Sequence, residues 1–72
     1  MSITQNIGSR IKELRGNRGI SQESLAHLAG LDRTYINSVE NGKRNIGIEN
    51  IEKIAKALDV SVRDFFDTEE FS

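Results

Sequence analysis

The chain has 72 residues, of which 36% are hydrophobic and 29% charged, and this size and composition predict one small globular domain over residues 1–72 and exclude a two-domain enzyme. It contains no cysteine and one histidine, which excludes disulfides and thiol nucleophiles and makes a metal or cofactor site unexpected. No apolar run is long enough for a signal peptide or a membrane span, so a cytoplasmic protein is expected. The absence of proline favours helices joined by short glycine turns.

The formal net charge of −1 conceals an uneven distribution along the chain. Seven basic and four acidic residues give residues 1–45 a net charge of +3, whereas three basic and seven acidic residues give residues 46–72 a net charge of −4. Nucleic-acid binders are usually basic, so the first part of the chain is the part suited to an anionic partner. A charged face that only meets solvent is the alternative.

The first predicted helix covers Thr4–Asn17. Ile7, Ile11 and Leu14 recur at three- and four-residue intervals and form one apolar stripe. The limits of this helix are marked by a capping-box pair and by two glycines, namely Ser2, Gln5, Gly16 and Gly19.

Two short helices are predicted next, over Gln22–Ala29 and Arg33–Glu40. Ser21 and Asp32 precede them and are good N-caps, and Gly30 between them suits the left-handed conformation of a helix end. The side chains expected to face the core from these helices are Leu25, Leu28, Ile36 and Val39.

A loop over residues 43–47 leads to a fourth predicted helix, Ile48–Leu58. Its apolar stripe consists of Ile51, Ile54, Ala55 and Leu58. Ser61, with Asp64 three residues later, predicts the start of a short fifth helix that carries Val62, Phe65 and Phe66. The residues Thr68–Ser72 are expected to be frayed.

The second and third helices match the helix-turn-helix unit, which places its second helix in the major groove of DNA. Counted over about residues 22–41, the unit requires five apolar residues, one small residue and a glycine at the turn. Every position is filled, by Leu25, Ala26, Ala29, Gly30, Leu31, Ile36 and Val39. A generic helical hairpin fills some of these positions by chance, but seven matches are specific. The predicted fold is all-α, a compact five-helix bundle with a helix-turn-helix.

Through SQESLAHLAGLDRTYINSVENGKR and the downstream IEKIAKALDVS, the chain resembles the phage repressor and Cro type of helix-turn-helix protein. Within that family, DRTYINSVENGKRNIGIENIEKIA is most similar to the controller proteins of restriction-modification systems. The resemblance implies a lambda-repressor-like DNA-binding domain with no catalytic activity. It also implies a two-fold dimer built from the fourth and fifth helices, about residues 48–66.

Five residues of the third helix are candidate base contacts. Arg33 and Thr34 open this helix, and arginine can grip guanine O6 and N7 in bidentate fashion; a phosphate contact or a surface ion pair is the alternative for Arg33, and simple exposure for Thr34. The resemblance places Tyr35 against the DNA, whereas a half-buried ring covering the first helix is equally compatible with the sequence. Asn37 and Ser38 follow one turn later and are either further base contacts or ordinary exposed polar residues.

Candidate contacts to the DNA backbone lie outside that helix. Ser21 leaves free backbone N–H groups at a helix start, where an anion is favoured, and the resemblance assigns a phosphate contact to Gln22. It also assigns DNA contacts to Arg44 and Asn45, and a backbone contact to Lys43. Helix capping and solvated loop residues are the alternatives.

Two further assignments concern the scaffold. The resemblance pairs Arg15 of the first helix with Glu40, at the end of the third, as a structural ion pair. Large apolar side chains exceed what so small a chain readily buries, so a dimer interface is expected to take part of them, with completion of the core as the alternative. The interface candidates are Ile48, Ile51, Phe65 and Phe66. Gly47 and Asp59 depart from the family pattern at the two ends of the fourth helix.

The leading hypothesis is therefore a sequence-specific transcriptional regulator that binds double-stranded operator DNA as a homodimer. The resemblance implies a controller protein of a restriction-modification system, which binds inverted-repeat operators ahead of its own gene and the endonuclease gene. RNA polymerase is a candidate partner of such a regulator, and a membrane partner is not expected. Within the same class, a phage-type repressor or an antitoxin that represses its own operon is the alternative. The alternative from another class is a protein-interaction module that works through the acidic half of the chain.

Overall fold

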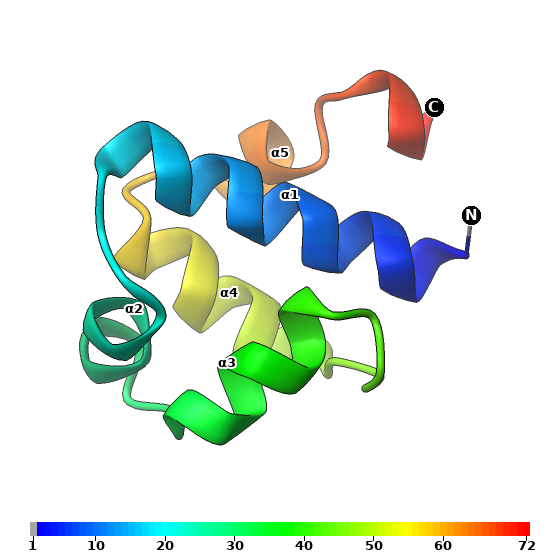
Figure 1. Cartoon of the computed structure of the whole chain (residues 1–72). Helices are drawn as coiled ribbons and strands as arrows, with labels where there is room; N and C mark the ends of the chain where they lie inside the picture. The colour runs from blue at the N-terminus through cyan, green and yellow to red at the C-terminus, as the bar shows by residue number, and fades with distance from the viewer. Residues whose placement is uncertain (1) are drawn as a thin grey trace.

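The computed structural model describes residues 2–72, which form five α-helices and a short 3-10 helix. The α-helices are α1 (Ile3–Arg18), α2 (Gln22–Ala29), α3 (Arg33–Glu40), α4 (Ile48–Ala57) and α5 (Val62–Phe65), and the 3-10 helix η1 spans Glu69–Phe71. The long α1 lies across one side of the bundle, α2 and α3 lie on the opposite side, and both chain ends are on the same side of the molecule (Figure 1). The predicted all-α class is confirmed.

Side chains that precede four of the α-helices cap them as predicted. Ser2 accepts a hydrogen bond from the backbone of Gln5, whose side chain binds back to the backbone of Ser2 to complete the capping box. The other side-chain caps are Ser21 on α2, Asp32 on α3 and Ser61 on α5. At the start of α4 the capping position is held by Gly47, which offers no side chain, so α4 depends on its packing to form.

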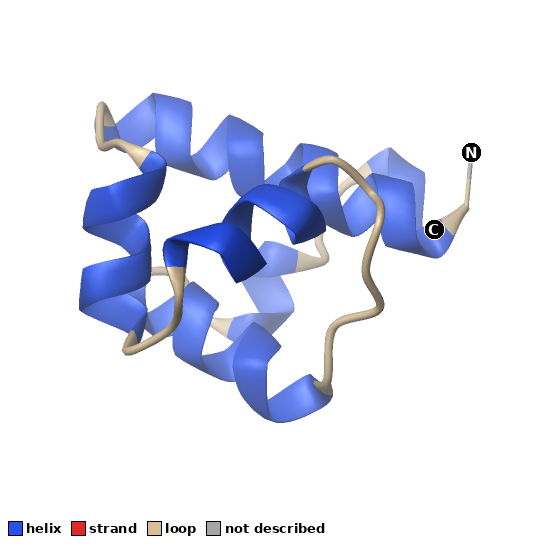
Figure 2. Ribbon diagram, turned by 60° about the horizontal axis from the view of Figure 1, so that its bottom comes forward, coloured by secondary structure: helices blue, strands red, loops and turns tan. Residues whose placement is uncertain are grey.

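The boundaries of α2 and α3 agree with the prediction, but α1 is longer than the predicted Thr4–Asn17. Gly16 continues the helix, and only Gly19, with φ of 65°, adopts the left-handed conformation that ends it. Gly30 ends α2 in the same conformation, with φ of 69°. The short turn that follows brings α3 across α2 at a steep angle (Figure 2).

The core is formed by all five α-helices. Each contributes one side chain with no exposed surface, and these are Ile11, Leu25, Ile36, Ile54 and Phe65. α3 packs against both α1 and α2, and α4 packs against α2 and α5. Burial of this apolar surface fixes the position of α3, whose outer face is left free.

The prediction that Leu28 faces the core is wrong, because 60% of its surface is exposed. The buried face of α2 is formed by Leu25, Ala26 and Ala29. At about 100° per residue, burial of Ala26 turns that face away from Leu28.

The prediction that Thr68–Ser72 are frayed is also wrong. Residues of this segment form η1, and the ring of Phe71 packs edge-on against Phe66 with 5.0 Å between the ring centroids. The Nδ2 of Asn6 in α1 donates to the carbonyl oxygen of Glu70 at 3.3 Å. One aromatic residue at the end of a polar segment therefore anchors it, an effect that composition alone does not indicate.

Arg10 ties α5 to α1. Its Nε donates to the carbonyl oxygen of Phe65 at 2.8 Å, and its Nη2 donates to the carbonyl oxygen of Asp64 at 2.9 Å. These bonds satisfy carbonyls at the end of α5 that a helix of four residues cannot satisfy internally. In residues 2–72 no helix is long and apolar enough to cross a membrane.

Candidate nucleic-acid interface

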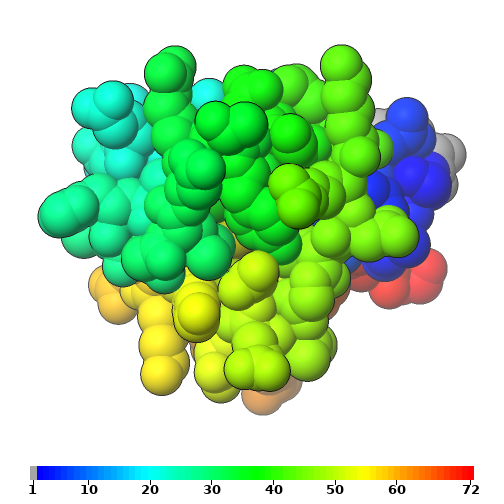
Figure 3. Space-filling model, turned by 90° about the horizontal axis from the view of Figure 1, so that it is seen from below, coloured from blue at the N-terminus to red at the C-terminus, as the bar shows by residue number. Residues whose placement is uncertain are grey.

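The outer face of α3 carries the first group of candidate contacts. Ile36 and Val39 are buried on the inner face, so Arg33, Thr34 and Asn37 are turned outward, where all three are exposed and line one shallow hollow. Seen from below, α3 runs across the middle of one face of the molecule, with α2 on one side and the loop over residues 41–47 on the other (Figure 3). The face has the exposed polar surface that contact with base edges requires.

The structure separates the five candidate base contacts into two groups. Whereas Arg33, Thr34 and Asn37 are exposed, Tyr35 and Ser38 are only half-exposed. The carbonyl oxygen of Ser38 accepts a hydrogen bond from the backbone of Lys43 at 3.0 Å, which fixes the start of the loop after α3. Ser38 is thus half-buried at the junction of α3 with this loop, which the helical pattern does not indicate.

Tyr35 lies against α4 rather than against α1. Its hydroxyl accepts a hydrogen bond from Asn50 Nδ2 at 3.0 Å, and the guanidinium of Arg44 lies over its ring, 5.0 Å from the centroid. A cation over an aromatic face is attracted by the ring quadrupole. The half-buried ring of Tyr35 therefore holds Arg44 beside α3. Tyr35 thus packs against α4 and also positions a cation of the polar face.

The loop after α3 is basic and is tied to α1. Lys43, Arg44 and Asn45 are all exposed. Asn45 Oδ1 accepts a hydrogen bond from Thr4 Oγ1 at 2.9 Å, across 41 positions of the sequence. Gly42, with φ of 70°, turns the chain out of α3. The loop is thus held in place at both its ends, which positions its cations beside α3.

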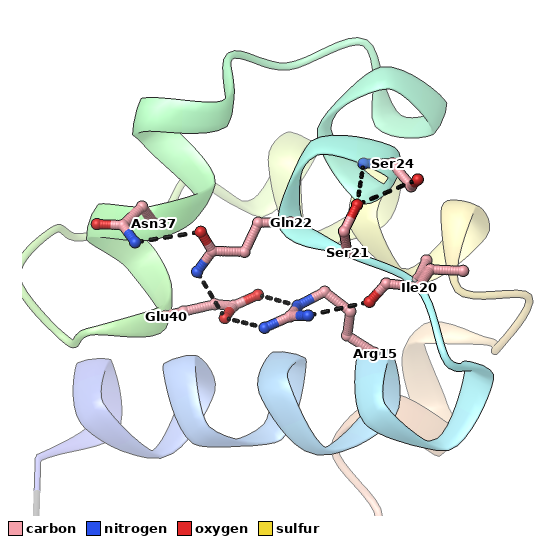
Figure 4. A network of polar contacts seen from close by, with 7 residues as sticks. All are labelled: Arg15, Ile20, Ser21, Gln22, Ser24, Asn37 and Glu40. Atoms are coloured by element: carbon pink, nitrogen blue, oxygen red, sulfur yellow. Dashed lines mark hydrogen bonds and ion pairs between the residues drawn. The ribbon is translucent and has the colours of Figure 1, made fainter.

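A buried ion pair connects α1 to α3. The Nε and Nη2 of Arg15 donate to Glu40 Oε2 and Oε1 at 2.8 and 2.9 Å, and Nη1 donates to the carbonyl oxygen of Ile20 at 2.9 Å (Figure 4). The Glu40 side chain has no exposed surface, and that of Arg15 is 19% exposed. The hydrogen bond to Glu40 raises the pKa of Arg15 above its ordinary value, so the guanidinium stays charged. The structure contains the ion pair that the resemblance implies.

The network extends from this ion pair to the outer face of α3. Gln22 Nε2 donates to Glu40 Oε1 at 3.1 Å, and Gln22 Oε1 accepts from Asn37 Nδ2 at 3.1 Å (Figure 4). Asn37 Oδ1 in turn accepts from Asn41 Nδ2 at 3.2 Å. The candidate phosphate contact on α2 and a candidate base contact on α3 are therefore joined directly.

The start of α2 faces the start of α3. Ser21 Oγ accepts a hydrogen bond from the backbone N–H of Ser24 at 3.0 Å. Its hydroxyl therefore caps α2, which was the alternative to a DNA backbone contact. A common hollow is lined by Arg15, Ser21, Gln22, Glu23 and Arg33. Backbone N–H groups at the helix start and the guanidinium of Arg33 favour an anion at this place, whereas the charge of Arg15 is matched by Glu40 and the carboxylate of Glu23 opposes an anion.

Two of the four residues predicted for a dimer interface lie elsewhere. Phe65 has no exposed surface and Ile51 is 5% exposed, so both belong to the core of one chain, and their assignment to an interface is wrong. Phe66 is half-buried and packs edge-on against Phe65 and Phe71. Ile48 is 72% exposed and stays available to a partner. The apolar stripe of α4 faces inward, whereas Ile48, the first residue of the helix, lies outside that stripe.

Sequence reasoning missed three polar residues of this surface, Thr4, Asn41 and Asn50. Each supports a candidate contact from another part of the fold, namely Asn45, Asn37 and Tyr35, respectively. For Asn41, the spacing of four residues from Asn37 on neighbouring helical turns was an available signal. No local pattern connects Thr4 or Asn50 to its partner.

Two short helices joined by a glycine turn, with the second presenting a polar face, define a helix-turn-helix protein. Residues 11–65 match the model of that family, so the chain belongs to the helix-turn-helix family. It is 44% identical over 65 residues to the control protein C.MunI of a Mycoplasma species, across 89% of this chain and 88% of that protein. The resemblance to controller proteins is thereby confirmed.

Solved structures of controller proteins have the same fold. The restriction-modification controller protein C.AhdI from Aeromonas hydrophila is 49% identical, with a TM-score of 0.84 over 88% of this chain and 96% of that one. The controller protein C.Esp1396I, solved as a tetramer in complex with its natural 35 base-pair operator, is 40% identical. Its TM-score is 0.87 over 93% of this chain and 90% of that one.

Proposed function

We propose that this chain is a sequence-specific transcriptional regulator that binds operator DNA through α3, as a controller protein of a restriction-modification system. The observation that carries the proposal is the exposed polar face of α3, in a fold shared with a controller protein solved in complex with its operator. We propose no catalytic activity and no cofactor, since the relatives are regulators, and a cytoplasmic location follows from the proposed work on DNA.

Arg33 is the proposed principal base contact. Within residues 2–72 it forms no hydrogen bond and no ion pair, whereas Arg10 and Arg15 are bound to groups of the protein. Its guanidinium is therefore free to bind guanine O6 and N7. Thr34 and Asn37 line the same hollow and complete the proposed base-reading surface.

The DNA backbone is proposed to run past the two ends of this surface. At one end, the start of α2 offers backbone N–H groups and the side chain of Gln22. At the other, Lys43, Arg44 and Asn45 project from the loop, and Arg44 is held over the ring of Tyr35. Phosphate contacts at both ends would fix how α3 lies in the groove.

A homodimer is the proposed binding unit, with α4 and α5 at its interface. Ile48 and Val62, the first residues of these helices, are 72% and 38% exposed, and the half-buried Phe66 follows α5. A two-fold axis would set two copies of α3 about 34–36 Å apart, so the operator half-sites would form an inverted repeat. Contact with RNA polymerase remains a prediction from the class of protein.

The Arg33→Ala variant is expected to lose about 1–3 kcal/mol of binding to the operator and to lose base preference at one position of each half-site, because one bidentate contact is removed. Titration against single-base variants of the operator by fluorescence anisotropy measures both effects.

Lys43→Ala is the matched control. This variant is expected to weaken binding to every duplex equally and to reduce the slope of log K against log salt by about 1 per subunit, because it removes a phosphate contact. Equal weakening of all duplexes by Arg33→Ala would instead make Arg33 a phosphate contact.

A further inference from the structure

The ion pair between Arg15 and Glu40 fixes the direction of every hydrogen bond in the network that reaches α3. A guanidinium has only donors and a carboxylate only acceptors, so the Gln22 atom that meets Glu40 Oε1 must be its donor, Nε2. Gln22 Oε1 consequently points the other way, to Asn37. The side-chain amide of Gln22 could otherwise rotate by about 180° at little cost. The buried carboxylate of Glu40 fixes it in one orientation.

The same constraint passes on to Asn37. Because Gln22 presents an oxygen, the Asn37 atom that meets it must be the donor Nδ2, at 3.1 Å. The Oδ1 of Asn37 is left on the side of Asn41, whose Nδ2 donates to it at 3.2 Å. Both atoms of the Asn37 amide are therefore held, although its side chain is exposed on the outer face of α3.

This arrangement leaves Asn37 with a defined capacity for further bonds. Of its two N–H groups one is used by Gln22, and of the two acceptor positions on its oxygen one is used by Asn41. One donor and one acceptor, on the nitrogen and the oxygen of the same amide group, remain for a ligand. In the major groove adenine presents one acceptor, N7, beside one donor, the N6 amino group.

The other bases fit this pattern less well. Guanine presents two acceptors, which require two donors. One of the two N–H groups of Asn37 already donates to Gln22, so only one is available to guanine. Cytosine offers only a donor, and thymine offers an acceptor beside a methyl group. We propose that Asn37 reads an adenine and that Gln22, held by Glu40, is the positioning residue that makes it selective for adenine over guanine. This inference rests on the proposed function of the chain.

The position of this adenine relative to the Arg33 contact follows from the helix. Arg33 and Asn37 are separated by four residues, hence by about 6 Å along α3 at 1.5 Å per residue. Successive base pairs are separated by about 3.4 Å. The adenine is therefore expected one or two base pairs from the guanine bound by Arg33, in every half-site.

The test is the base preference of the Gln22→Leu variant, which keeps the size of the side chain and removes both of its hydrogen bonds. At the position read by Asn37, wild-type protein is expected to prefer adenine over guanine by about 5- to 150-fold. Gln22→Leu is expected to bind the two bases within about threefold of each other there, and to keep its preference for guanine at the Arg33 position. Anisotropy titrations with operators that differ at one base measure both positions.

Two protein variants separate this proposal from a general loss of structure. Asn37→Ala is expected to lose the same preference, and adding Gln22→Leu to it is expected to change nothing further at that position. Glu23→Gln, on the neighbouring exposed residue of α2, is expected to keep the wild-type preferences at both positions.

A change in the DNA tests the proposal on wild-type protein, whether or not the variants fold. Replacing the adenine by 7-deazaadenine removes N7 and is expected to weaken wild-type binding at least fivefold. Unchanged wild-type affinity, or a Gln22→Leu variant that weakens all operators equally and keeps the preference for adenine, would overturn the role of Asn37 and Gln22. Failure of the wild-type chain to select any operator would instead refute the proposed function itself.

Discussion

The Glu40→Ala variant is expected to unfold with a free energy about 3–5 kcal/mol lower than that of the wild-type chain. Glu40 has no exposed side-chain surface and accepts three hydrogen bonds, two from Arg15 and one from Gln22. Its removal leaves the Arg15 guanidinium largely buried without a counter-charge, which costs far more than the loss of a solvated pair. The contact that ties α1 to α3 is lost with it.

The matched control is Glu13→Ala, which removes the acidic partner of Arg10. The Glu13 side chain is 58% exposed, so its ion pair is worth about 0.2–1 kcal/mol. Urea unfolding followed by far-ultraviolet circular dichroism compares the two variants directly. If both unfolded at the same urea concentration, Glu40 would contribute no more than a surface charge, and the structural role of the network would be wrong.

The Gly8→Ala variant is expected to lose about 1–3 kcal/mol of stability or more. Gly8 is buried where α1 crosses α3, and a Cβ atom added there would lie against the carbonyl oxygens of Val39 and Glu40, the second at 2.7 Å. These are backbone atoms that cannot rotate away as a side chain does, so the two helices would have to separate. The core between them would then lose contacts.

Gly16→Ala, in the same helix, provides a control of the opposite sign. Gly16 is helical and exposed, and an added Cβ meets no atom within 4 Å. Alanine there is expected to raise the free energy of unfolding by about 0.5–1 kcal/mol, because glycine is the poorer helix former. If both variants were destabilised to a similar extent, the loss of stability would come from alanine in α1 at either position. That result would contradict a close approach of α3 at Gly8.

The elements of the fold could be predicted because their signals are local. A capping side chain, an apolar stripe and a terminal glycine lie within a few residues of one another, and α2 and α3 accordingly have the predicted limits. The prediction for Leu28 is wrong because the eight residues of α2 give two overlapping apolar faces, and only the packing of α2 against α3 and α4 decides which face is buried. The packing of Phe71 could not be predicted because a single aromatic residue forms no periodic pattern.

The candidate site could be predicted in its residues but not in its connections. Arg33, Thr34 and Asn37 follow from the outer face of α3, yet nothing in their spacing shows that Asn37 is bound to Gln22, 15 positions earlier. The bond depends on the angle at which α3 crosses α2. The dimer residues fail for a similar reason, since Phe65 and Ile51 are apolar in either role and only the folded chain shows that the core takes them.

The central claim is that α3 reads a DNA sequence in a dimeric protein, and selection of bound duplexes from a random pool tests it most directly. The wild-type chain is expected to enrich an inverted repeat with a guanine and an adenine one or two base pairs apart in each half-site. Affinity for the selected duplex is expected to fall steeply as salt is raised, because phosphate contacts release counterions. A pool that stays random, with binding insensitive to salt, would contradict the account and direct attention to protein partners of the acidic half of the chain.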